Sequence, residues 1–300
     1  MHYGEYAAKC ACCKSFRTHP IDIEPKAKYD NKVRQAVLDR ILVDKLNATT
    51  VQQAMARDFL LELSTGFIYD CMQYAIRKFD GADFRAKVLS EFSGTLCVDE
   101  IHLGHRVVLL VSDPIADNPI ACALVSSNDG AHMIRFLRNL KNHGFFPKTV
   151  ISDRSPLYPK TITEVWPEAK HQLCVFHVMS DVNDHVLDAV RDVRRAIKPK
   201  RVKKGKGRPS KRHQARVKKL KEQREQAEDN MTKLLAYLDR PPSVRSKVRT
   251  NNHVERCNRV LRYLEKVRYK WRRRRTIIRH ILLQFDNWMK RKENRATIAA

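Results

Sequence analysis

Residues 148–177 alternate between short apolar runs and turn-forming residues, and this alternation leaves few folds open. The run Thr149–Ile151 predicts a strand that delivers Asp153 to its end, where an Arg-Ser-Pro turn follows. A helical segment over Tyr158–Trp166 leads to a second buried run, Leu173–Phe176. A carboxylate at the end of a strand faces a cleft while being rigidly held, so Asp153 is a candidate metal ligand.

The region before this segment predicts three strands joined by short turns, which is typical of an antiparallel meander. An amphipathic helix over Ala131–His143 then leads to the fourth strand. The five predicted strands are Thr95–Ile101, Arg106–Ser112, Pro119–Ser126, Thr149–Ser152 and Leu173–Phe176. This order of elements predicts an α/β fold, the mixed sheet with flanking helices of a ribonuclease H-like domain.

Asp99 lies at the far end of the first predicted strand. The first and fourth strands are neighbours in this topology, so Asp99 and Asp153 are expected to converge although they are distant in the sequence. Glu100 should point to the opposite face, because side chains alternate along a strand. His102 and His105 flank the following hairpin and are interpreted as turn residues rather than ligands.

Positive charge is concentrated in two blocks of the chain. Among its 300 residues, 59 are Lys or Arg and 33 are Asp or Glu, for a formal net charge of +26. Residues 198–224 hold 14 of the basic residues against one acid, and residues 256–275 hold 10 against one. Two basic blocks on an otherwise nearly neutral chain favour a polyanionic partner, here nucleic acid, over a general effect on solubility.

The eight cysteines are scattered along the chain, and several occur within apolar runs. This usage is typical of a reducing compartment rather than of a disulfide framework. No apolar stretch is long enough to cross a membrane, and the N-terminus lacks the apolar core of a signal peptide. We therefore expect a cytoplasmic protein with no membrane partner.

Residues 1–29 form a polar segment that contains Cys10, Cys12, Cys13 and His19. A structural zinc site usually takes two separated ligand pairs, and no second pair follows this crowded group. The segment is therefore interpreted as a loose terminal region. A truncated zinc module is the alternative.

Residues 30–82 are predicted to form three short helices separated by tight turns. Apolar residues recur there at helical spacing, and Thr49 or Thr50 is the expected N-cap of the second helix. The third helix is predicted over Phe67–Phe79. This pattern favours a helix-turn-helix DNA-binding domain, whose last helix would enter the major groove. The alternative is an all-α packing module.

Residues 179–248 are predicted to be a helical, basic insertion. A helical pattern runs to about Ile197 and meets the first basic block. Within that block, Gly207-Arg208-Pro209 resembles an AT-hook, which reads the minor groove of A·T-rich DNA. A general phosphate-binding linker is the alternative interpretation.

The last basic block predicts an amphipathic helix that could present Glu255. Its apolar stripe consists of Val254, Cys257, Leu261 and Leu264. A helix that docks this stripe on the sheet would place Glu255 at the rim, whereas the alternative is a surface pair of Glu255 with Arg259. Position 255 alone favours the surface pair, although among the glutamates Glu255 is the best candidate for a third ligand. The others are Glu164 and Glu168, which follow Asp153 too closely, and Glu265, which lies between two arginines.

Basic residues expected to contact DNA lie in these blocks and at the end of the third predicted helix. They are Arg77, Lys78, Lys203, Lys204, Arg208, Lys211, Arg212, Arg259, Arg262, Arg272 and Arg273. We expect the two blocks to dominate non-specific affinity, while residues 30–82 supply most of the sequence recognition.

Four motifs follow one another along the chain. They are Asp99 in VDEIHLG, Asp153 in ISDRSPLY, the run from Trp166 to His177 with Cys174 and His177, and Glu255 in TNNHVERCNR. In this order they resemble the DDE transposases of prokaryotic insertion sequences that carry a helical insertion before the glutamate. The Cys-x-x-His feature is similar to that of Mutator-like and hAT transposases. The resemblance covers about residues 30–290.

The resemblance implies that Asp99, Asp153 and Glu255 are catalytic and hold two Mg²⁺ or Mn²⁺ ions. Residues 92–178 and 249–292 would form the catalytic core around the insertion. Two such ions can clamp a scissile phosphate from both sides, so the enzyme would cut the terminal inverted repeats of its element and join a 3′-OH to target DNA. Cys174 and His177 would have a structural role near the active site, because two ligands do not make a zinc site.

The same resemblance implies a homodimer or larger assembly on DNA, in the nucleoid of a prokaryotic cell. Two other functions remain alternatives. The first is a catalytically decayed or domesticated DNA-binding regulator, against which the three intact acids argue. The second is a ribonuclease H-like nuclease or resolvase that only hydrolyses DNA, which an assay of 3′-OH joining would distinguish from a transposase.

Overall fold

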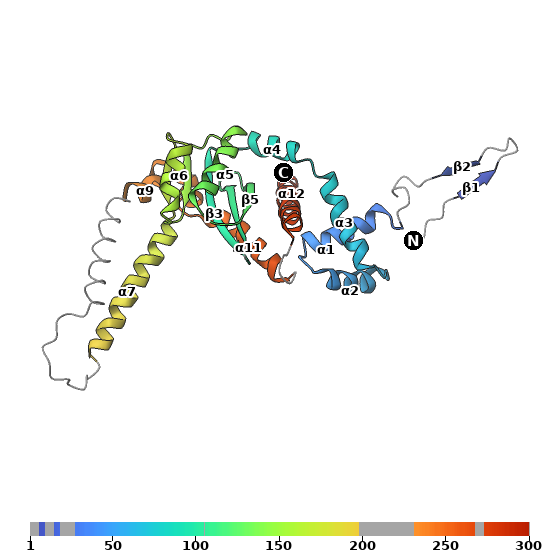
Figure 1. The fold of residues 1–300 in the computed structure, drawn as a ribbon, viewed down its shortest axis with the longest axis horizontal. Helices are drawn as coiled ribbons and strands as arrows, with labels where there is room; N and C mark the ends of the chain where they lie inside the picture. The colour runs from blue at the N-terminus through green and yellow to red at the C-terminus, as the bar shows by residue number, and fades with distance from the viewer. Residues whose placement is uncertain are drawn as a thin grey trace. The chain divides into compact units, whose positions relative to one another are not determined.

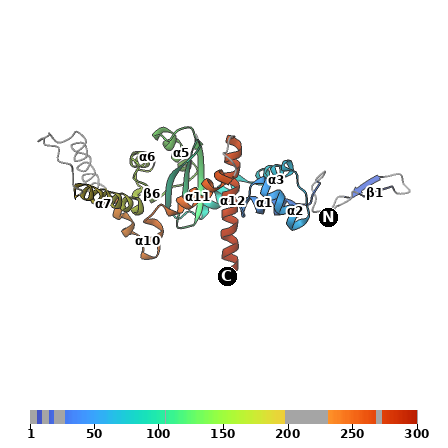
Figure 2. The same cartoon turned by 90° about the horizontal axis from the view of Figure 1, so that it is seen from below.

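The computed structural model divides the chain into two compact units, residues 1–81 with 263–300 and residues 82–262. It describes residues 6–9, 15–18, 28–104, 106–197, 231–267 and 273–299. Figures 1 and 2 show the elements of both units. Within the described ranges, no helix combines the length and the apolar character needed to cross a bilayer.

The core of the second unit is a five-stranded mixed sheet in the order β5-β4-β3-β6-β7. Its strands are β3 (Thr95–Leu103), β4 (Arg106–Asp113), β5 (Asn118–Val125), β6 (Thr149–Ser152) and β7 (Lys170–Leu173). β3, β4 and β5 pair antiparallel, whereas β6 runs parallel to both β3 and β7. The predicted α/β class, a mixed sheet flanked by helices, is confirmed.

Both faces of this sheet are covered, as the unbroken apolar sequence of β4 requires. Val107 to Val111 of β4 are all buried. Helices α5 (Gly130–Asn142) and α6 (Leu157–Val165) contact each other and bury Met133, Leu137 and Ile162. Helix α11 (Asn252–Val267) buries the predicted stripe of Val254, Cys257, Leu261 and Leu264. Figures 1 and 2 show these helices around the sheet.

β3 is longer than the sequence suggested, so Asp99 lies within the strand and not at its far end. The strand continues to Leu103, and its last pair with β4 joins Leu103 to Arg106. Gly104 occupies the turn with a φ of 60°, in the left-handed region that glycine enters without strain. The tight turn lets the antiparallel pairing continue up to the hairpin.

The fifth strand lies earlier than predicted. β7 ends at Leu173, and helix α7 runs from Val175 to Ile197, so the residues predicted as the end of a strand form the first turn of a helix. β7 ends there because its partner strand β6 is short: the last residue of β6, Ser152, pairs with Leu173. Cys174 therefore stands at the junction of strand and helix, and His177 lies in the first turn of α7.

The last part of the predicted insertion forms short helices, of which the first two contact β7 of the sheet. They are α9 (Met231–Leu235), the 3₁₀ turn η1 (Ala236–Asp239) and α10 (Pro242–Val248). Pro241 separates η1 from α10, and Pro242 begins α10, where proline is tolerated in the first helical turn. The Gly207-Arg208-Pro209 segment lies outside the described residues. A further helix that the sequence did not predict, α4 (Gly81–Ser90), precedes β3.

Three N-terminal helices form the core of the first unit: α1 (Asn31–Leu42), α2 (Ala48–Phe59) and α3 (Thr65–Lys78). Their buried residues include Val37, Ile41, Met55 and Ile68. The predicted N-cap of α2 was wrong. Asn47 is the cap, because its side chain accepts a hydrogen bond from the Thr50 N–H at 2.9 Å, so Thr50 lies inside the helix.

The long helix α12 (Arg274–Ala299) packs with these N-terminal helices. Leu283 joins their apolar core, and Gln284 and Asn287 both donate to the Leu42 carbonyl, at 3.2 and 3.3 Å. The sequence assigned residues 249–292 to the core around the sheet. The structure instead groups the chain from Tyr263 onward with α1–α3.

A two-stranded antiparallel hairpin precedes α1, in the segment that was interpreted as loose. Its strands are β1 (Tyr6–Lys9) and β2 (Ser15–Thr18). Cys10, Cys12, Cys13 and His19 lie outside the described residues, so the alternative of a truncated zinc module stays a prediction.

Candidate active site

Asp99 lies on β3, and Asp153 directly follows the end of the neighbouring strand β6. Cys97 of β3 pairs with Ile151 of β6 in a parallel ladder. Asp99 lies two residues beyond Cys97, and Asp153 lies two residues beyond Ile151. Because strand side chains alternate between the two faces, this register brings the two carboxylates together. The prediction that the first and fourth strands are neighbours is confirmed.

The electrostatic surroundings of Asp99 are unfavourable for its charge. Burial, and then the negative charges of Glu100, Asp153 and Glu255, raise the pKa of Asp99 to about 7. Raised carboxyl pKa values of this kind follow from desolvation combined with like charges nearby. A cation bound among these groups would relieve both effects.

Glu100 leaves the face that Asp99 occupies, as the alternation along a strand predicts. Its carboxylate accepts hydrogen bonds from Asn128 at 2.8 Å and from the Tyr158 hydroxyl. Tyr158 belongs to α6 and is fully buried. Glu100 is therefore held by its own partners on the α6 side, whereas Asp99 is in contact with α11.

Helix α11 brings Glu255 to the acids on β3 and β6. One turn beyond Glu255, the Asn258 Nδ2 donates to Asp99 Oδ2 at 2.6 Å. At the start of the helix, the Asn251 Nδ2 donates to the Val98 carbonyl at 3.2 Å. These two amide side chains attach α11 to β3 on either side of Glu255. The side chain of Glu255 remains 30% exposed, so it is accessible while its helix is docked.

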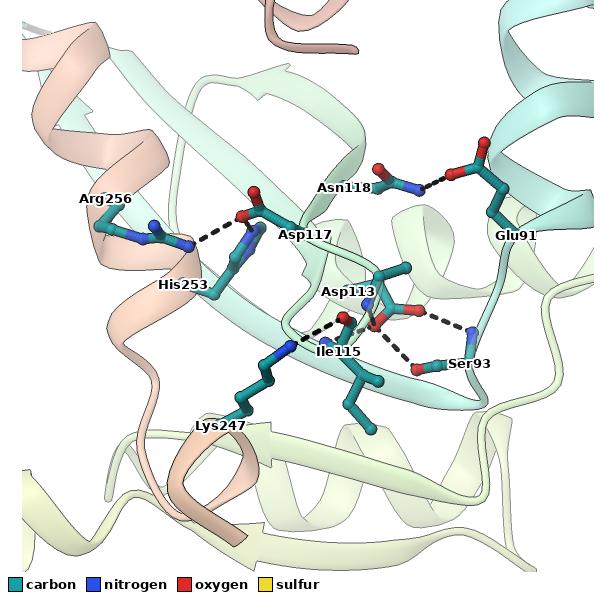
Figure 3. A network of polar contacts seen from close by, with 10 residues as sticks. Glu91, Ser93, Asp113, Ile115, Asp117, Asn118, Lys247, His253 and Arg256 are labelled. Carbon is teal, nitrogen blue, oxygen red and sulfur yellow. Dashed lines mark hydrogen bonds and ion pairs between the residues drawn. The ribbon is translucent and has the colours of Figure 1, made fainter. Parts of the chain in front are cut away.

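A polar network anchors the first turns of α11 to the loop between β4 and β5 (Figure 3). The buried His253 Nε2 lies 2.9 Å from Asp117 Oδ1, and the Arg256 Nη2 donates to the same oxygen at 2.9 Å. Lys247 donates to the Ile115 carbonyl at 3.4 Å. Although burial acts in the opposite direction, hydrogen bonds and charge from His253 and Arg256 lower the pKa of Asp117. The position of Glu255 relative to the sheet therefore depends on this loop.

The loop is itself held rigidly by Asp113, which is almost fully buried. Its carboxylate accepts from the Ser93 N–H and hydroxyl at 2.7 and 2.8 Å, and from the Ile115 and Ala116 N–H groups at 2.8 and 3.0 Å. A buried carboxylate with four donors is well compensated. Figure 3 shows this cluster beside the contact of Glu91 with Asn118.

A thiol and an imidazole lie on another side of Glu255. The buried Cys174 Sγ accepts a hydrogen bond from the Asn251 N–H at 3.2 Å. The His177 Nε2 lies 3.7 Å from Glu255 Oε1. One ligand atom from each of Cys174, His177 and Glu255 lies within 4.8 Å of the others. The sequence paired Cys174 with His177 but did not connect either residue to Glu255.

Cys174 and His177 shift each other toward a thiolate and an imidazolium. Hydrogen bonding to the Cys174 thiol, opposed by burial, raises the pKa of His177 to about 9. Burial acts against ionisation of Cys174, yet hydrogen bonds with His177 and the Asn251 backbone lower its pKa. The charges of Cys174 and His177 therefore stabilise each other, whereas the surroundings of Asp99 disfavour its charge.

The sequence matches the model of a family described as "Transposase, Mutator family" over residues 119–291. This chain belongs to the Mutator family of transposases. No curated protein matches it. The match confirms the predicted resemblance to transposases of insertion sequences, and membership implies an enzyme that acts on DNA. The matched part of the transposase includes Asp153, Cys174, His177 and Glu255, and it begins after Asp99.

Several predicted DNA-binding residues of the transposase lie on described helices or beside them. Arg77 and Lys78 end α3, Arg259 and Arg262 lie on α11, and Arg273 precedes α12. The other predicted contacts lie outside the described residues. They are Lys203, Lys204, Arg208, Lys211, Arg212 and Arg272.

Sequence reasoning missed the residues that hold the acids in place. Asn258 follows Glu255 by three residues, and this helical spacing could have indicated that the two side chains lie on the same face. His253 and Asp117 are far apart in the chain, and no local pattern connects them. Glu164, rejected as a ligand, forms an ion pair with Arg138 at 2.6 Å.

Proposed function

We propose that this transposase cuts DNA at the ends of its element and joins the resulting 3′-OH to target DNA, with Asp99, Asp153 and Glu255 as catalytic acids. The observation that carries the proposal is the strand register that sets Asp99 of β3 beside Asp153 after β6, together with the Asn258–Asp99 hydrogen bond that attaches α11 to β3 one turn from Glu255. Burial and then the charge of Glu100 raise the pKa of Asp99 most, and Asp153 and Glu255 add smaller contributions in the same direction. The β5-β4-β3-β6-β7 order supports a ribonuclease H-like core.

The donor set fits a hard divalent cation. Mg²⁺ and Mn²⁺ prefer carboxylate oxygens, and the buried Oε1 of Glu255 accepts no hydrogen bond among the described residues. Asp99, Asp153 and Glu255 would hold two such ions. When bound, the ions would activate the attacking oxygen and stabilise the leaving oxygen of the scissile phosphate.

Residues of the chain orient these acids before any substrate arrives. Asn258 fixes one oxygen of Asp99, and the Ser155 N–H donates to Asp153 Oδ1 at 2.9 Å. The network of His253 and Asp117 fixes the helix that carries Glu255. Such preorganisation is what phosphoryl transfer requires, because it consists mainly of positioning and electrostatic stabilisation.

The test compares Glu255→Gln with Glu265→Gln in the full chain. The substrate is DNA that carries the inverted repeats flanking the reading frame, and both strand cleavage and 3′-OH joining are measured with Mg²⁺. Glu255→Gln should fold and bind DNA normally but lose cleavage by several orders of magnitude, while Glu265→Gln stays active. The reverse result would show that the wrong glutamate has been assigned. Cleavage without joining would indicate a nuclease.

We further infer that α1–α3 recognise the element ends, with Arg77 and Lys78 at the exposed end of α3. Replacing both by Ala in the full chain should reduce the preference for end sequences over random DNA in competition binding. An unchanged preference would leave α1–α3 as a packing module. Because α12 belongs to the same unit, the full chain is the appropriate sample.

Arginines on α11 are suited to phosphate contacts. Replacing Arg259 and Arg262 by Ala should weaken binding to every DNA sequence, and it should lower the log-log salt slope by roughly 0.9 for each phosphate that the protein no longer neutralises. A slope that does not change would place this face of α11 away from DNA.

A further inference from the structure

We propose that Cys174, His177 and Glu255 form a three-ligand site for a borderline metal ion such as Zn²⁺. This site would share Glu255 with the catalytic acids. Binding at the site is independent of the proposed function, whereas its effect on cleavage rests on the proposed role of Glu255. The sequence offered only two of these ligands, and the third comes from a helix almost 80 residues further along the chain, at position 255.

The geometry requires only small side-chain movements. Tetrahedral zinc binds nitrogen and oxygen at about 2.0–2.2 Å and sulfur at about 2.3 Å, so neighbouring ligand atoms lie roughly 3.3–3.8 Å apart. The three ligand atoms already lie within 4.8 Å of one another, and His177 Nε2 is 3.7 Å from Glu255 Oε1. The ligand atoms would therefore have to approach one another by at most about 1.5 Å.

The donor chemistry differs from that of the proposed catalytic site. A metal ion that binds here displaces the proton of His177 into solvent. The resulting thiolate, neutral imidazole and carboxylate form a mixed soft and borderline set, which suits Zn²⁺ and binds Mg²⁺ poorly. Three protein ligands leave a fourth position for water. Asp99 and Asp153 offer only oxygen, the preference of Mg²⁺. The two ligand sets therefore select different ions although they meet at one glutamate.

The surroundings hold the ligands in place, as outer partners do in metal sites. The Asn251 N–H donates to the Cys174 sulfur, and the Val175 N–H donates to the Arg249 carbonyl at 2.9 Å. These bonds tie the β7–α7 junction to the chain just before α11, so both halves of the site are connected. The His177 side chain is 38% exposed, which gives an ion access from solvent to the buried thiol.

An ion at this site would compete for Glu255. A carboxylate drawn toward Cys174 and His177 is displaced from Asp99 and Asp153, so Zn²⁺ should inhibit Mg²⁺-dependent cleavage. The site would act as a metal-responsive control on the enzyme.

Co²⁺ binding to the metal-free full chain tests the site without DNA or cleavage. Every sample carries Ser in place of Cys10, Cys12 and Cys13, so that these thiols contribute no signal. We expect one equivalent of Co²⁺ to give a thiolate-to-cobalt charge-transfer band that Zn²⁺ abolishes. The band should be absent in Cys174→Ser, and His177→Ala and Glu255→Gln should weaken Co²⁺ binding by at least about tenfold.

Cys122→Ala is the matched control, since it removes a thiol from β5 and should leave the band unchanged. No charge-transfer band in the parent, or one that survives Cys174→Ser, would overturn the proposal. If Cys174→Ser fails to fold by circular dichroism, His177→Ala and Glu255→Gln decide the outcome, since both side chains are partly exposed. Unchanged Co²⁺ affinity in these two variants would also overturn it.

The effect on catalysis is measured separately, as the ratio of cleavage rates with and without Zn²⁺ at fixed Mg²⁺. The ratio should fall in the parent and stay near one in Cys174→Ser, whatever the absolute rate of each protein. Equal inhibition of both proteins would place the inhibitory ion elsewhere. A chain that binds Co²⁺ at this site but never cleaves DNA would refute the proposed function and leave the metal site standing.

Discussion

Glu255 meets two groups of residues with opposite electrostatic character. Toward β3 and β6, Asp99 and Asp153 offer only carboxylates, and burial, the charge of Glu100 and then that of Asp153 raise the pKa of Asp99 to about 7. Toward the β7–α7 junction, Cys174 and His177 stabilise each other's charges, and the pKa of His177 is raised to about 9 by the thiol. A bound cation would therefore favour the ionised form of the acids, whereas the thiol and the imidazole already favour each other's ionised form.

The two groups also differ in how the fold holds them. Asp99 and Asp153 are aligned by backbone pairing of β3 with β6. Glu255 depends on side chains, namely Asn258, His253 and Asp117, to keep α11 at the correct position. Backbone register tolerates substitutions at neighbouring side chains. The apolar stripe of α11 keeps the helix docked, but the polar contacts fix where Glu255 lies, so losing one of them should displace it. Substitutions of the acids and substitutions of the residues that position them should therefore have effects of different size.

The largest effect is expected at the acids themselves. Asp153→Asn removes a charged ligand and should lower Mg²⁺-dependent cleavage by about a thousandfold or more, with DNA affinity maintained. Cleavage rates and DNA binding are measured on the same samples. Glu164→Gln is the control, because it alters a carboxylate of similar sequence position that pairs with Arg138 at the surface. Comparable losses in both variants would contradict the assignment.

A smaller effect is expected where α11 is anchored. His253→Ala removes the buried imidazole that contacts Asp117 and should destabilise the fold by about 1–3 kcal/mol. The displacement of Glu255 should lower the cleavage rate by about 10–100-fold. Arg256→Ala, which removes the more exposed partner of Asp117, should have a weaker effect on both. Thermal unfolding and cleavage kinetics measure these quantities, and full activity in His253→Ala would show that Glu255 does not depend on this anchor.

The acids should also make stability depend on pH when metal is absent. Because the pKa of Asp99 is raised in the folded state from 3.8 to about 7, its stabilising contribution is fully present below about pH 4 and is lost as pH rises through 7. At 1.36 kcal/mol per unit, the change is at most roughly 4 kcal/mol. Urea unfolding in EDTA between pH 5 and pH 8 should show this loss, and Asp99→Asn should reduce it. Identical pH profiles would contradict the unfavourable environment of Asp99.

The smallest effect on magnesium chemistry is expected from the thiol. Cys174→Ser should change the Mg²⁺ concentration for half-maximal cleavage by less than about threefold, since thiolate is a poor Mg²⁺ ligand. Titration of cleavage with Mg²⁺ measures this directly. A large shift would mean that the two groups around Glu255 are not chemically separate.

Local patterns were sufficient to predict the first four strands of the sheet and the apolar stripe of α11. Periodicity identifies which residues are buried, and the order of elements then made β3 and β6 neighbours. The same patterns misplaced the fifth strand, because a short apolar run such as Leu173–Phe176 is compatible with strand or helix. The length of β6 decided between them, since β7 ends where its partner ends.

The chain's own sequence thus determined its class, its basic blocks, and the three acids and the Cys-x-x-His pair as candidates. Only the tertiary structure decided that Asn258 contacts Asp99, that His253 anchors α11 through Asp117, and that Glu255 joins Cys174 and His177. It also placed α12 with the N-terminal helices. The physical reason is that an amphipathic pattern predicts only which face of a helix is buried. Contacts between distant segments decide which surface covers that face.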